Sequence, residues 1–426
     1  MAQPSSSVVT LSAYKSAYKE LFPGMRVEQC SLRDRDLFRW MPKDPNFTGY
    51  AVDDSGGWYH IPVRYSKPQG LSYYFGQAQT KGGNATEGKG LVKSFKLPRK
   101  RYYGYLTIDE EAIAASKSKN GAFYSVKESE TEDLIAQVSE ELEKHLWGGS
   151  NGYLGQVKSI STTTITLYPG QAGNFHVGMS LGFNTAADGS GTDKADAVAR
   201  VTAVNFSANT ITTSADLSDD TAAVEADHYI FRGGDSVDVS ATGDAGNMVL
   251  GIGDWIPLTA ETSGTFLEVD RTDAVEYLQG WRKTDQGSIE ETIKALHSDM
   301  ISKGSKPDTI WMSYASWFRL EQELGSRAYR VDGEKGKFGL PSLQFMSAKG
   351  PLTVYAGSFC PDDRFYLLKR STWKFLHLGP VPHLVMSDGV SHRVMTGVDA
   401  LEVRCRYWGN LACMKPFDNG VGAISV

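Results

Sequence analysis

The side chains of this 426-residue chain that could carry chemistry are scattered and form no catalytic or metal-binding pattern. Short fixed spacings between histidines, cysteines and carboxylates are the sequence sign of such sites. The histidines show no HExxH pair and the cysteines no CxxC pair; they are His60, His145, His176, His228, His297, His377, His383 and His392, and Cys30, Cys360, Cys405 and Cys413. We therefore predict no catalytic residue, no metal and no cofactor.

One glycine-rich stretch nearly matches a phosphate-binding loop. Gly83 to Lys89 (GNATEGK) fits the frame G-x-x-x-x-G-K, but Gly90 stands where the frame needs the Ser or Thr that holds magnesium. Such a loop also follows a buried strand and opens a helix, whereas polar residues precede this stretch and strand-like residues follow it. We predict a hairpin tip instead. The acidic turn at Asp188, Asp193 and Asp196 likewise lacks the spacing of a calcium loop.

Two stretches of opposite charge are the best candidates for a binding function. Between Glu87 and Asp109 lie six basic residues and no acid, a charge of +6: Lys89, Lys93, Lys96, Arg99, Lys100 and Arg101. Residues 127–145 carry a charge of −5, from two lysines and seven acids: Glu128, Glu130, Glu132, Asp133, Glu140, Glu141 and Glu143. We predict that the basic stretch of one subunit lies over the acidic stretch of its neighbour, since complementary potentials set register. Two independently solvated faces are the alternative, because exposed pairs contribute only about 0 to 1 kcal/mol each.

The acidic stretch lies on one long predicted helix over residues 126–147. Its apolar residues recur every four positions, which places a narrow apolar stripe on a polar helix: Leu134, Val138, Leu142 and Leu146. Ser125 and Ser129 each precede a glutamate by three residues, the capping-box spacing.

The basic stretch lies on the return arm of a predicted hairpin. Residues 58–108 are rich in β-branched and aromatic residues around the glycine-rich tip at 81–90. An isolated ribbon is at best marginally stable, so this hairpin needs another surface. Ahead of it, residues 9–22 predict a short amphipathic helix. Residues 23–45 predict a charged strap whose apolar anchors lie across another domain or subunit.

Two compact modules and a final strand follow the long helix. Residues 153–235 are short β-rich runs between Gly, Asp, Asn and Ser turns, typical of a small inserted antiparallel barrel or sandwich. Residues 245–400 alternate helices and strands, with a capping box at Ser288 and Glu291. Leu401 to Tyr407 alternates apolar and charged residues, which predicts a strand with its apolar face on the long helix.

The composition is that of an ordinary globular protein. Hydrophobic residues make up 41% and charged residues 22%, and no apolar run approaches the length of a membrane span. The net charge of −6 argues weakly against a dedicated nucleic-acid binder and does not exclude a surface that faces nucleic acid. The cysteine usage favours a reduced compartment, with the thiols as small core residues.

The order of these elements resembles the major capsid proteins of tailed bacteriophages, the Hong Kong 97-type fold of the α+β class. Three stretches are similar to segments of that family's axial domain: Gly253 to Thr272 (GDWIPLTAETSGTFLEVDRT), residues 288–304 (SIEETIKALHSDMISKG) and Pro307 to Arg327 (PDTIWMSYASWFRLEQELGSR). The resemblance implies an N-terminal arm at 1–49, an extended loop at 50–108, a peripheral domain at 109–152 and 391–426, an inserted β-domain at 153–235, and an axial domain at 236–390.

The resemblance also implies a function. It implies a non-enzymatic virion capsid subunit, assembled in the host bacterial cytoplasm, that forms the hexamers and pentamers of an icosahedral shell around double-stranded DNA. A portal and a decoration protein are implied partners. The resemblance implies neither membrane association nor sequence-specific DNA binding. Since only 57 residues precede Trp58, we expect a separate scaffolding protein or none. An encapsulin-like compartment is the first alternative, and a soluble β-rich binding protein or hydrolase the second.

Overall fold

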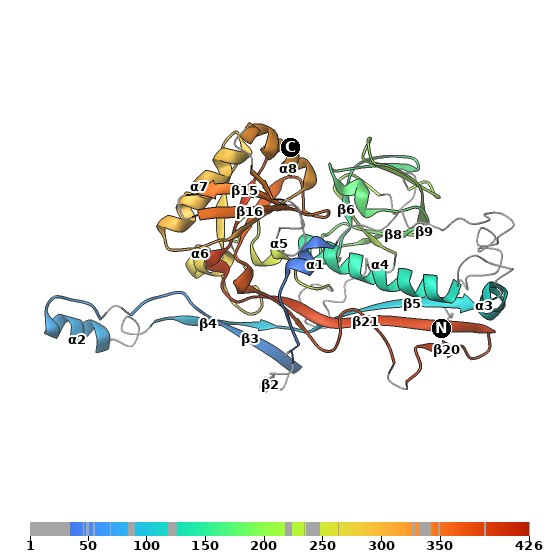
Figure 1. Ribbon diagram of the computed structural model, residues 1–426, viewed down its shortest axis with the longest axis horizontal. Helices are drawn as coiled ribbons and strands as arrows, with labels where there is room; N and C mark the ends of the chain where they lie inside the picture. Colours follow the sequence, from blue (N-terminus) through green and yellow to red (C-terminus); the bar gives the residue numbers. More distant parts are fainter. Residues whose placement is uncertain are drawn as a thin grey trace.

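The fold is built around one long helix that lies on a sheet. The computed structural model describes residues 35–45, 47, 51–53, 56–68, 70–83, 90–117, 126–217, 224–233, 235, 248–262, 264–325, 329–331, 342–347, 350–386 and 389–425. The molecule is elongated: a hairpin projects at one end, an α/β body and a barrel rise on one side, and a long sheet lies along the other (Figure 1). The predicted helix at 9–22 and residues 84–89 of the predicted hairpin tip at 81–90 lie outside the described residues.

The long helix is α4, Val126–Gly148, as the sequence predicts. Its stripe of Leu134, Val138, Leu142 and Leu146 is 0–8% exposed. It packs on strands β5 (Lys100–Asp109) and β21 (Ala400–Cys413), which pair antiparallel from Ala400↔Asp109 to Gly409↔Lys100. Gly104 lets the sheet approach closely, since a Cβ there would lie 2.7 Å from Cγ2 of Val138. The predicted contact between the final strand and this helix is confirmed.

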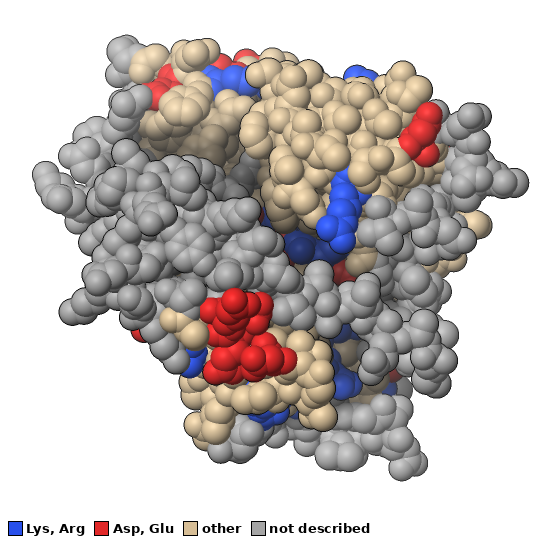
Figure 2. All heavy atoms as spheres, turned by 90° about the vertical axis from the view of Figure 1, so that its right-hand side faces the viewer, with Lys and Arg blue, Asp and Glu red and all other residues tan. Residues whose placement is uncertain are grey.

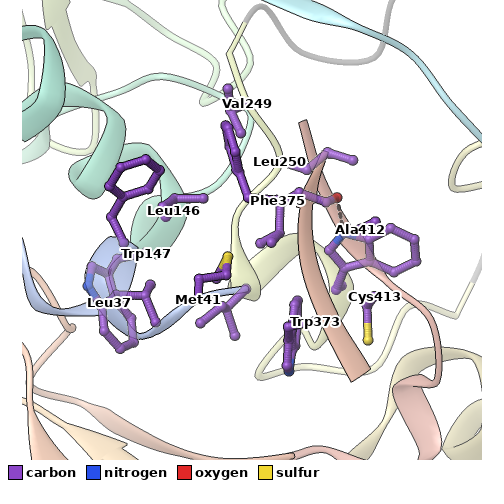
Figure 3. Packing of buried hydrophobic residues seen from close by; sticks show 14 of the residues in the cluster. Leu37, Met41, Leu146, Trp147, Val249, Leu250, Trp373, Phe375, Ala412 and Cys413 are labelled. Carbon is purple, nitrogen blue, oxygen red and sulfur yellow. Dashed lines mark hydrogen bonds between the residues drawn. The ribbon is translucent and has the colours of Figure 1, made fainter. Parts of the chain in front are cut away.

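A six-stranded sheet contains β5 and β21 and holds the main core. Its other strands are β1 (Lys43–Asp44), β18 (Trp373–His377), β19 (His383–Leu384) and β20 (His392–Val394). Figure 3 shows side chains of α1 (Asp36–Trp40), the end of α4, β18 and β21 in one cluster, with Trp147 beside Leu37. The strap predicted at 23–45 therefore lies, over its described residues, across the core of its own chain. Strand β18 lies within residues 245–400, which were predicted to form one α/β module, but it joins this sheet and not the α/β sheet.

The projecting hairpin differs in part from the prediction. Strands β2 (Ala51–Asp53), β3 (Gly56–Arg64) and β4 (Val92–Leu97) form a three-stranded antiparallel sheet. The predicted return arm ends at Leu97, and beyond Pro98 the chain leaves the hairpin to form β5. The predicted hairpin treats residues 71–79 as extended, which is wrong, because Phe75–Gly83 forms helix α2. Period-2 alternation cannot predict α2, which buries none of its residues.

A seven-stranded sheet forms the α/β body. Its order is β12 (Trp281–Lys283), β22 (Gly420–Ala423), β17 (Arg364–Leu368), β13 (Thr309–Met312), β16 (Gly350–Ala356), β15 (Ser342–Ser347) and β14 (Tyr329–Val331). The predicted helices are α7 (Ile289–Ser302) and α8 (Tyr314–Leu324). Ser288 caps α7 by accepting the N–H of Glu291, as predicted. Because β22 belongs to this sheet, the chain does not stay in the first sheet after residue 391, contrary to the predicted boundary.

The inserted module is a closed six-stranded antiparallel barrel in the order β10-β7-β6-β11-β8-β9. The strands are β6 (Gly155–Ser161), β7 (Thr164–Leu167), β8 (Ser180–Asn184), β9 (Asp193–Asn205), β10 (Thr210–Thr213) and β11 (Tyr229–Arg232). It has its own hydrophobic cluster. Its first and last strands pair, Ile230 opposite Gly155, so the two connections to the body leave side by side.

Short helices complete the chain. They are α3 (Glu110–Lys117), α5 (Ile252–Trp255), α6 (Val275–Gln279) and 3-10 turns at Gln171–Asn174, Thr272–Ala274, Arg370–Thr372 and Pro416–Asp418. Within the described ranges, no helix combines the length and the apolar character needed to cross a membrane.

Candidate subunit interface

The tip of the projecting hairpin exposes a concentrated group of large apolar side chains. Leu71 is 83% exposed, Tyr73 98%, Tyr74 67% and Phe75 81%. They lie at the start of α2, far from the α/β body (Figure 1). On a soluble protein such a patch marks an interaction site. We call these four residues the apolar tip.

The base of the hairpin, in contrast, is anchored in its own subunit. Phe95 is fully buried and packs edge-on against Trp255 at 5.3 Å between ring centroids. Lys93 Nζ lies 2.5 Å from Asp273 Oδ2, and Lys96 Nζ lies 2.6 Å from Glu268 Oε2. A fixed base and an unsupported tip are the geometry of an arm that reaches away from the subunit.

The six basic residues predicted to form one interface are dispersed. Lys93 and Lys96 form ion pairs within their own chain, and Lys89 lies outside the described residues. Lys100 is only 5% exposed. Arg101 is exposed on β5 and belongs to a different sheet from the lysines of β4. The prediction of one continuous basic arm is therefore wrong, because the chain changes sheets at Pro98. Arg99 is exposed between the two strands.

The acidic residues predicted on the long helix divide into two groups. Glu128 and Glu132 are exposed, and Glu130 and Asp133 are half-buried. By contrast, three predicted interface residues are 1–8% exposed, which removes them from contact with a neighbour in this conformation: Glu140, Glu141 and Glu143. Only the first half of α4 therefore offers an acidic surface. Figure 2 shows this end of the molecule, where acidic side chains gather below the barrel.

Glu143 is a buried carboxylate that holds the N-terminal segment against α4. Its Oε1 accepts the backbone N–H of Leu37 at 2.9 Å and the indole N–H of Trp147 at 3.2 Å, and its Oε2 accepts the N–H of Phe38 at 2.8 Å. Burial raises its pKa to about 7, although the three donors oppose this rise and nearby Asp36 adds to it. The sequence signal that could have separated Glu143 from the solvated acids is Trp147, one helical turn later.

A second buried group joins the barrel to the helix. Glu141 Oε1 lies 2.5 Å from Nη2 of Arg232 at the end of β11 and 3.0 Å from Nζ of Lys144. Burial raises the pKa of Glu141, but these two cations outweigh burial and lower it to about 2. Burial lowers the pKa of neighbouring His145 to about 4, so this ring is neutral at pH 7. Glu141 is thus a structural ion-pair partner.

A groove of about 670 Å³ lies between the end of α4, the barrel and the start of α8. Cys360 in its wall is buried, and burial raises the pKa of its thiol well above the ordinary value, which does not suit a nucleophile. No group of three or more metal-ligating side chains lies close enough to hold an ion anywhere in the described part of the chain.

One serine stands in a catalytic spacing, although the sequence was expected to hold no G-x-S-x-G motif. Residues 148–152 read G-x-S-x-G, the spacing of a hydrolase nucleophile turn. That turn joins a strand to a following helix, whereas here the motif follows helix α4 and its N-terminal glycine ends it. Ser150 is buried and donates its N–H to Asp254 at 2.7 Å. The motif therefore serves as a turn out of α4.

No protein-family model matches this chain, and no curated protein matches it either. Solved structures similar to it include the cyanophage A-1(L) capsid asymmetric unit, with 10% identity, a TM-score of 0.49 and coverage of 95% of this chain and 97% of that chain. Another, from Mycobacterium phage Ogopogo, has 9% identity, a TM-score of 0.42 and coverage of 98% and 100%. The SrpI encapsulin complex of Synechococcus elongatus PCC 7942 has 7% identity, a TM-score of 0.45 and coverage of 95% and 93%. Most are bacteriophage structures, in agreement with the predicted resemblance. At these identities and TM-scores, the similarity alone establishes no family for this chain.

Proposed function

We propose that this chain is the major capsid protein of a tailed bacteriophage. In this proposal it has the Hong Kong 97-type fold and assembles with copies of itself into an icosahedral shell that encloses the double-stranded DNA genome. The hairpin is the extended loop, α4 with the first sheet the peripheral domain, and the seven-stranded sheet the axial domain. A portal, a scaffolding protein and a decoration protein are its proposed virion partners.

The observation that carries the proposal is the apolar tip on its projecting arm. Leu71, Tyr73 and Phe75 are each more than 80% exposed, and α2 buries none of its residues within the subunit. Burying a large apolar side chain stabilises a contact by roughly 1.5 to 3 kcal/mol. A hairpin tip with this much exposed apolar surface needs a docking surface, and its own body is out of reach because the arm points away from it (Figure 1).

A second copy of the chain is the occupant that explains the arm best. A contact between an arm on one subunit and a different surface on the next is head-to-tail, and such contacts generate rings or extended assemblies. A shell requires this kind of contact at every subunit. The exposed acids Glu128 and Glu132 give the neighbour's α4 a charged rim on which an arm carrying exposed Lys81 could be aligned.

The barrel occupies the outer side of the proposed shell. It stands on the opposite side of α4 from the sheet of β5 and β21 (Figure 1). In a shell one subunit thick, these two sides become the convex and concave surfaces. Domains that stand out from the layer crowd one another on the concave side, so the barrel fits the convex side.

Electron cryomicroscopy of particles purified after expression of the full chain tests the function. We expect closed shells whose subunits exchange their hairpins, with the barrels outside. Shells that enclose protein cargo and exclude DNA in the presence of a packaging system would instead support the encapsulin-like alternative. A single-subunit species at all concentrations would support the soluble binding protein or hydrolase.

A further inference from the structure

The face of the first sheet that points away from α4 is rich in arginine. Side chains alternate along β5 and β21, and Tyr102, Val403, Cys405 and Tyr407 point toward the helix and are largely buried. The opposite positions form the other face. We call them the arginine face: Arg101, Tyr103, Tyr105, Glu402, Arg404, Arg406 and Trp408, with Arg393 opposite Glu402 on β20 and His383 opposite Arg406 on β19.

The charge of this face is opposite to that of the chain. Four arginines and one glutamate give it a charge of +3 with His383 neutral, while the whole chain carries −6. The single acid is also neutralised locally. Glu402 Oε1 lies 2.7 Å from Nη2 of Arg404, and its Oε2 accepts the hydroxyl of Tyr105 at 3.2 Å. The face therefore presents positive potential to solvent.

Aromatic side chains support the arginines. The guanidinium of Arg406 lies over the ring of Trp408, 4.1 Å from its centroid, and its Nε is 3.5 Å from Nε2 of His383. Tyr103 is 59% exposed and Tyr105 51%. Stacking uses the face of a guanidinium and leaves its in-plane N–H groups able to donate to an anion.

The spacing of the arginines suits a regular polyanion. Arg404 and Arg406 lie two residues apart on one strand, about 6.8 Å at the usual rise. DNA carries one phosphate per strand every 3.4 Å along its axis, and because the strand winds around that axis, neighbouring phosphates of one strand lie about 7 Å apart in space, close to this spacing. Arginine recognises phosphate with paired N–H donors, and contacts of this kind carry no sequence information.

We propose that the arginine face binds the sugar-phosphate backbone of double-stranded DNA without sequence preference. The inference rests on the proposed function for its biological setting, because the face lies opposite the barrel and so lines the shell interior. An acidic protein segment is the other class of partner that positive charge could attract. DNA fits better because the charges are arginines, two of them at a regular spacing on one strand, and they lie beside the exposed rings of Tyr103 and Tyr105.

The test is fluorescence anisotropy of a labelled 30-base-pair duplex of mixed sequence, titrated with unassembled subunits between 50 and 200 mM NaCl. The test variant is Arg101→Gln/Arg404→Gln. The matched control is Lys158→Gln/Arg200→Gln, which removes the same charge from exposed positions on the barrel. We expect the test variant to bind at least about tenfold more weakly at 50 mM salt, with a log–log salt slope smaller by about 2. The control should match the wild type.

Each outcome separates the inference from the proposed function. Equal weakening of the test and control variants, or no weakening of either, overturns the inference, as does tighter binding of polyglutamate than of the duplex. Arg101→Gln alone should lower the slope by about 1, which keeps the test valid if loss of Arg404 disturbs the Glu402 cluster. Sedimentation of the same proteins after assembly reports shell formation independently. Shells without duplex binding contradict only the inference, and duplex binding without shells contradicts only the proposed function.

Discussion

The backbone N–H of Leu37 donates to Oε1 of Glu143 at 2.9 Å, although 106 residues separate them in the chain. Phe38 adds a second donor to the same carboxylate. A buried carboxyl group on the long helix therefore holds the first described helix in the core, where Leu37 and Trp40 are fully buried. This contact couples the N-terminal segment to the helix on which the fold is built.

Replacing Glu143 with alanine should lower the free energy of unfolding by roughly 2 to 4 kcal/mol. The N–H groups of Leu37 and Phe38 would remain buried without an acceptor, and each such loss costs about 1 to 3 kcal/mol. Urea denaturation of the unassembled subunit measures this. Glu128→Ala, at an exposed position on the same helix, is the control and should change stability by less than about 0.5 kcal/mol. Equal effects of the two substitutions would show that the hydrogen bonds from Leu37 and Phe38 to Glu143 do not stabilise the fold.

Glu143 should also make stability depend on pH. Its pKa is about 7 in the folded protein, above its ordinary value of 4.5. Between these pH values the folded protein retains a proton that the unfolded chain has released, so this group's contribution to stability falls as pH rises through the window. Glu143→Gln removes the titration. We expect the stability of the wild type relative to Glu143→Gln to fall from pH 4.5 to 7 and to level off above about 7.5. Parallel stability curves for the two proteins would contradict this.

The sequence predicted those elements whose buried faces produce a regular spacing of apolar residues or a cap within a few positions. The stripe from Leu134 to Leu146 and the cap at Ser288 predicted α4 and α7, and the alternation from Leu401 to Tyr407 predicted the contact of β21 with α4. The turn-rich texture of residues 153–235 predicted the barrel. Each signal depends on neighbours within a few residues, which is why one sequence could reveal it.

The features that the sequence did not predict depend on contacts between residues far apart in the chain, or belong to segments that make few contacts with the rest of the subunit. The charge run from Lys93 to Arg101 could not show that the chain changes sheets at Pro98. Glu143 differs from exposed Glu132 in sequence only by Trp147 one turn later, and its main partner, Leu37, comes from a distant part of the chain. Helix α2 was not predicted because it has no buried face, so its sequence shows no helical spacing of apolar residues.

Replacing Arg232 with glutamine should loosen the connection between the barrel and α4. Glu141 would keep Lys144 but lose its closest cation, so we expect a loss of about 1 to 3 kcal/mol, less than when a buried charge loses every partner. Hydrogen exchange should speed up in β11 and at the end of α4 and stay unchanged in α7. Arg200→Gln, on the exposed barrel surface, is the matched control. Unchanged hydrogen exchange in β11 would show that the Arg232–Glu141 ion pair does not hold the barrel on α4.

The exposed acids at the start of α4 should act in assembly. Glu128→Lys/Glu132→Lys should leave the unfolding of the subunit unchanged and slow assembly, most strongly at low salt, because screening weakens exposed charges. Light scattering during assembly at 20 and 300 mM NaCl measures the effect. Glu110→Lys/Glu111→Lys on α3 reverses the same charge outside α4 and is the control. Identical assembly rates in the wild type and the α4 variant at low salt would show that these acids take no part in the interface.

The central claim, that the projecting arm joins subunits into a shell, is tested most directly by sedimentation velocity of the wild type and of Leu71→Ser/Tyr73→Ser/Phe75→Ser. The matched control is Val177→Ser/Phe206→Ser, which removes exposed apolar side chains from the barrel. We predict that the wild type and the control sediment as large closed particles. We predict that the tip variant, with unfolding unchanged because these side chains contact little of their own subunit, sediments as single subunits or small oligomers. Shells formed by the tip variant at the wild-type yield, or a wild type that never assembles, would contradict the claim.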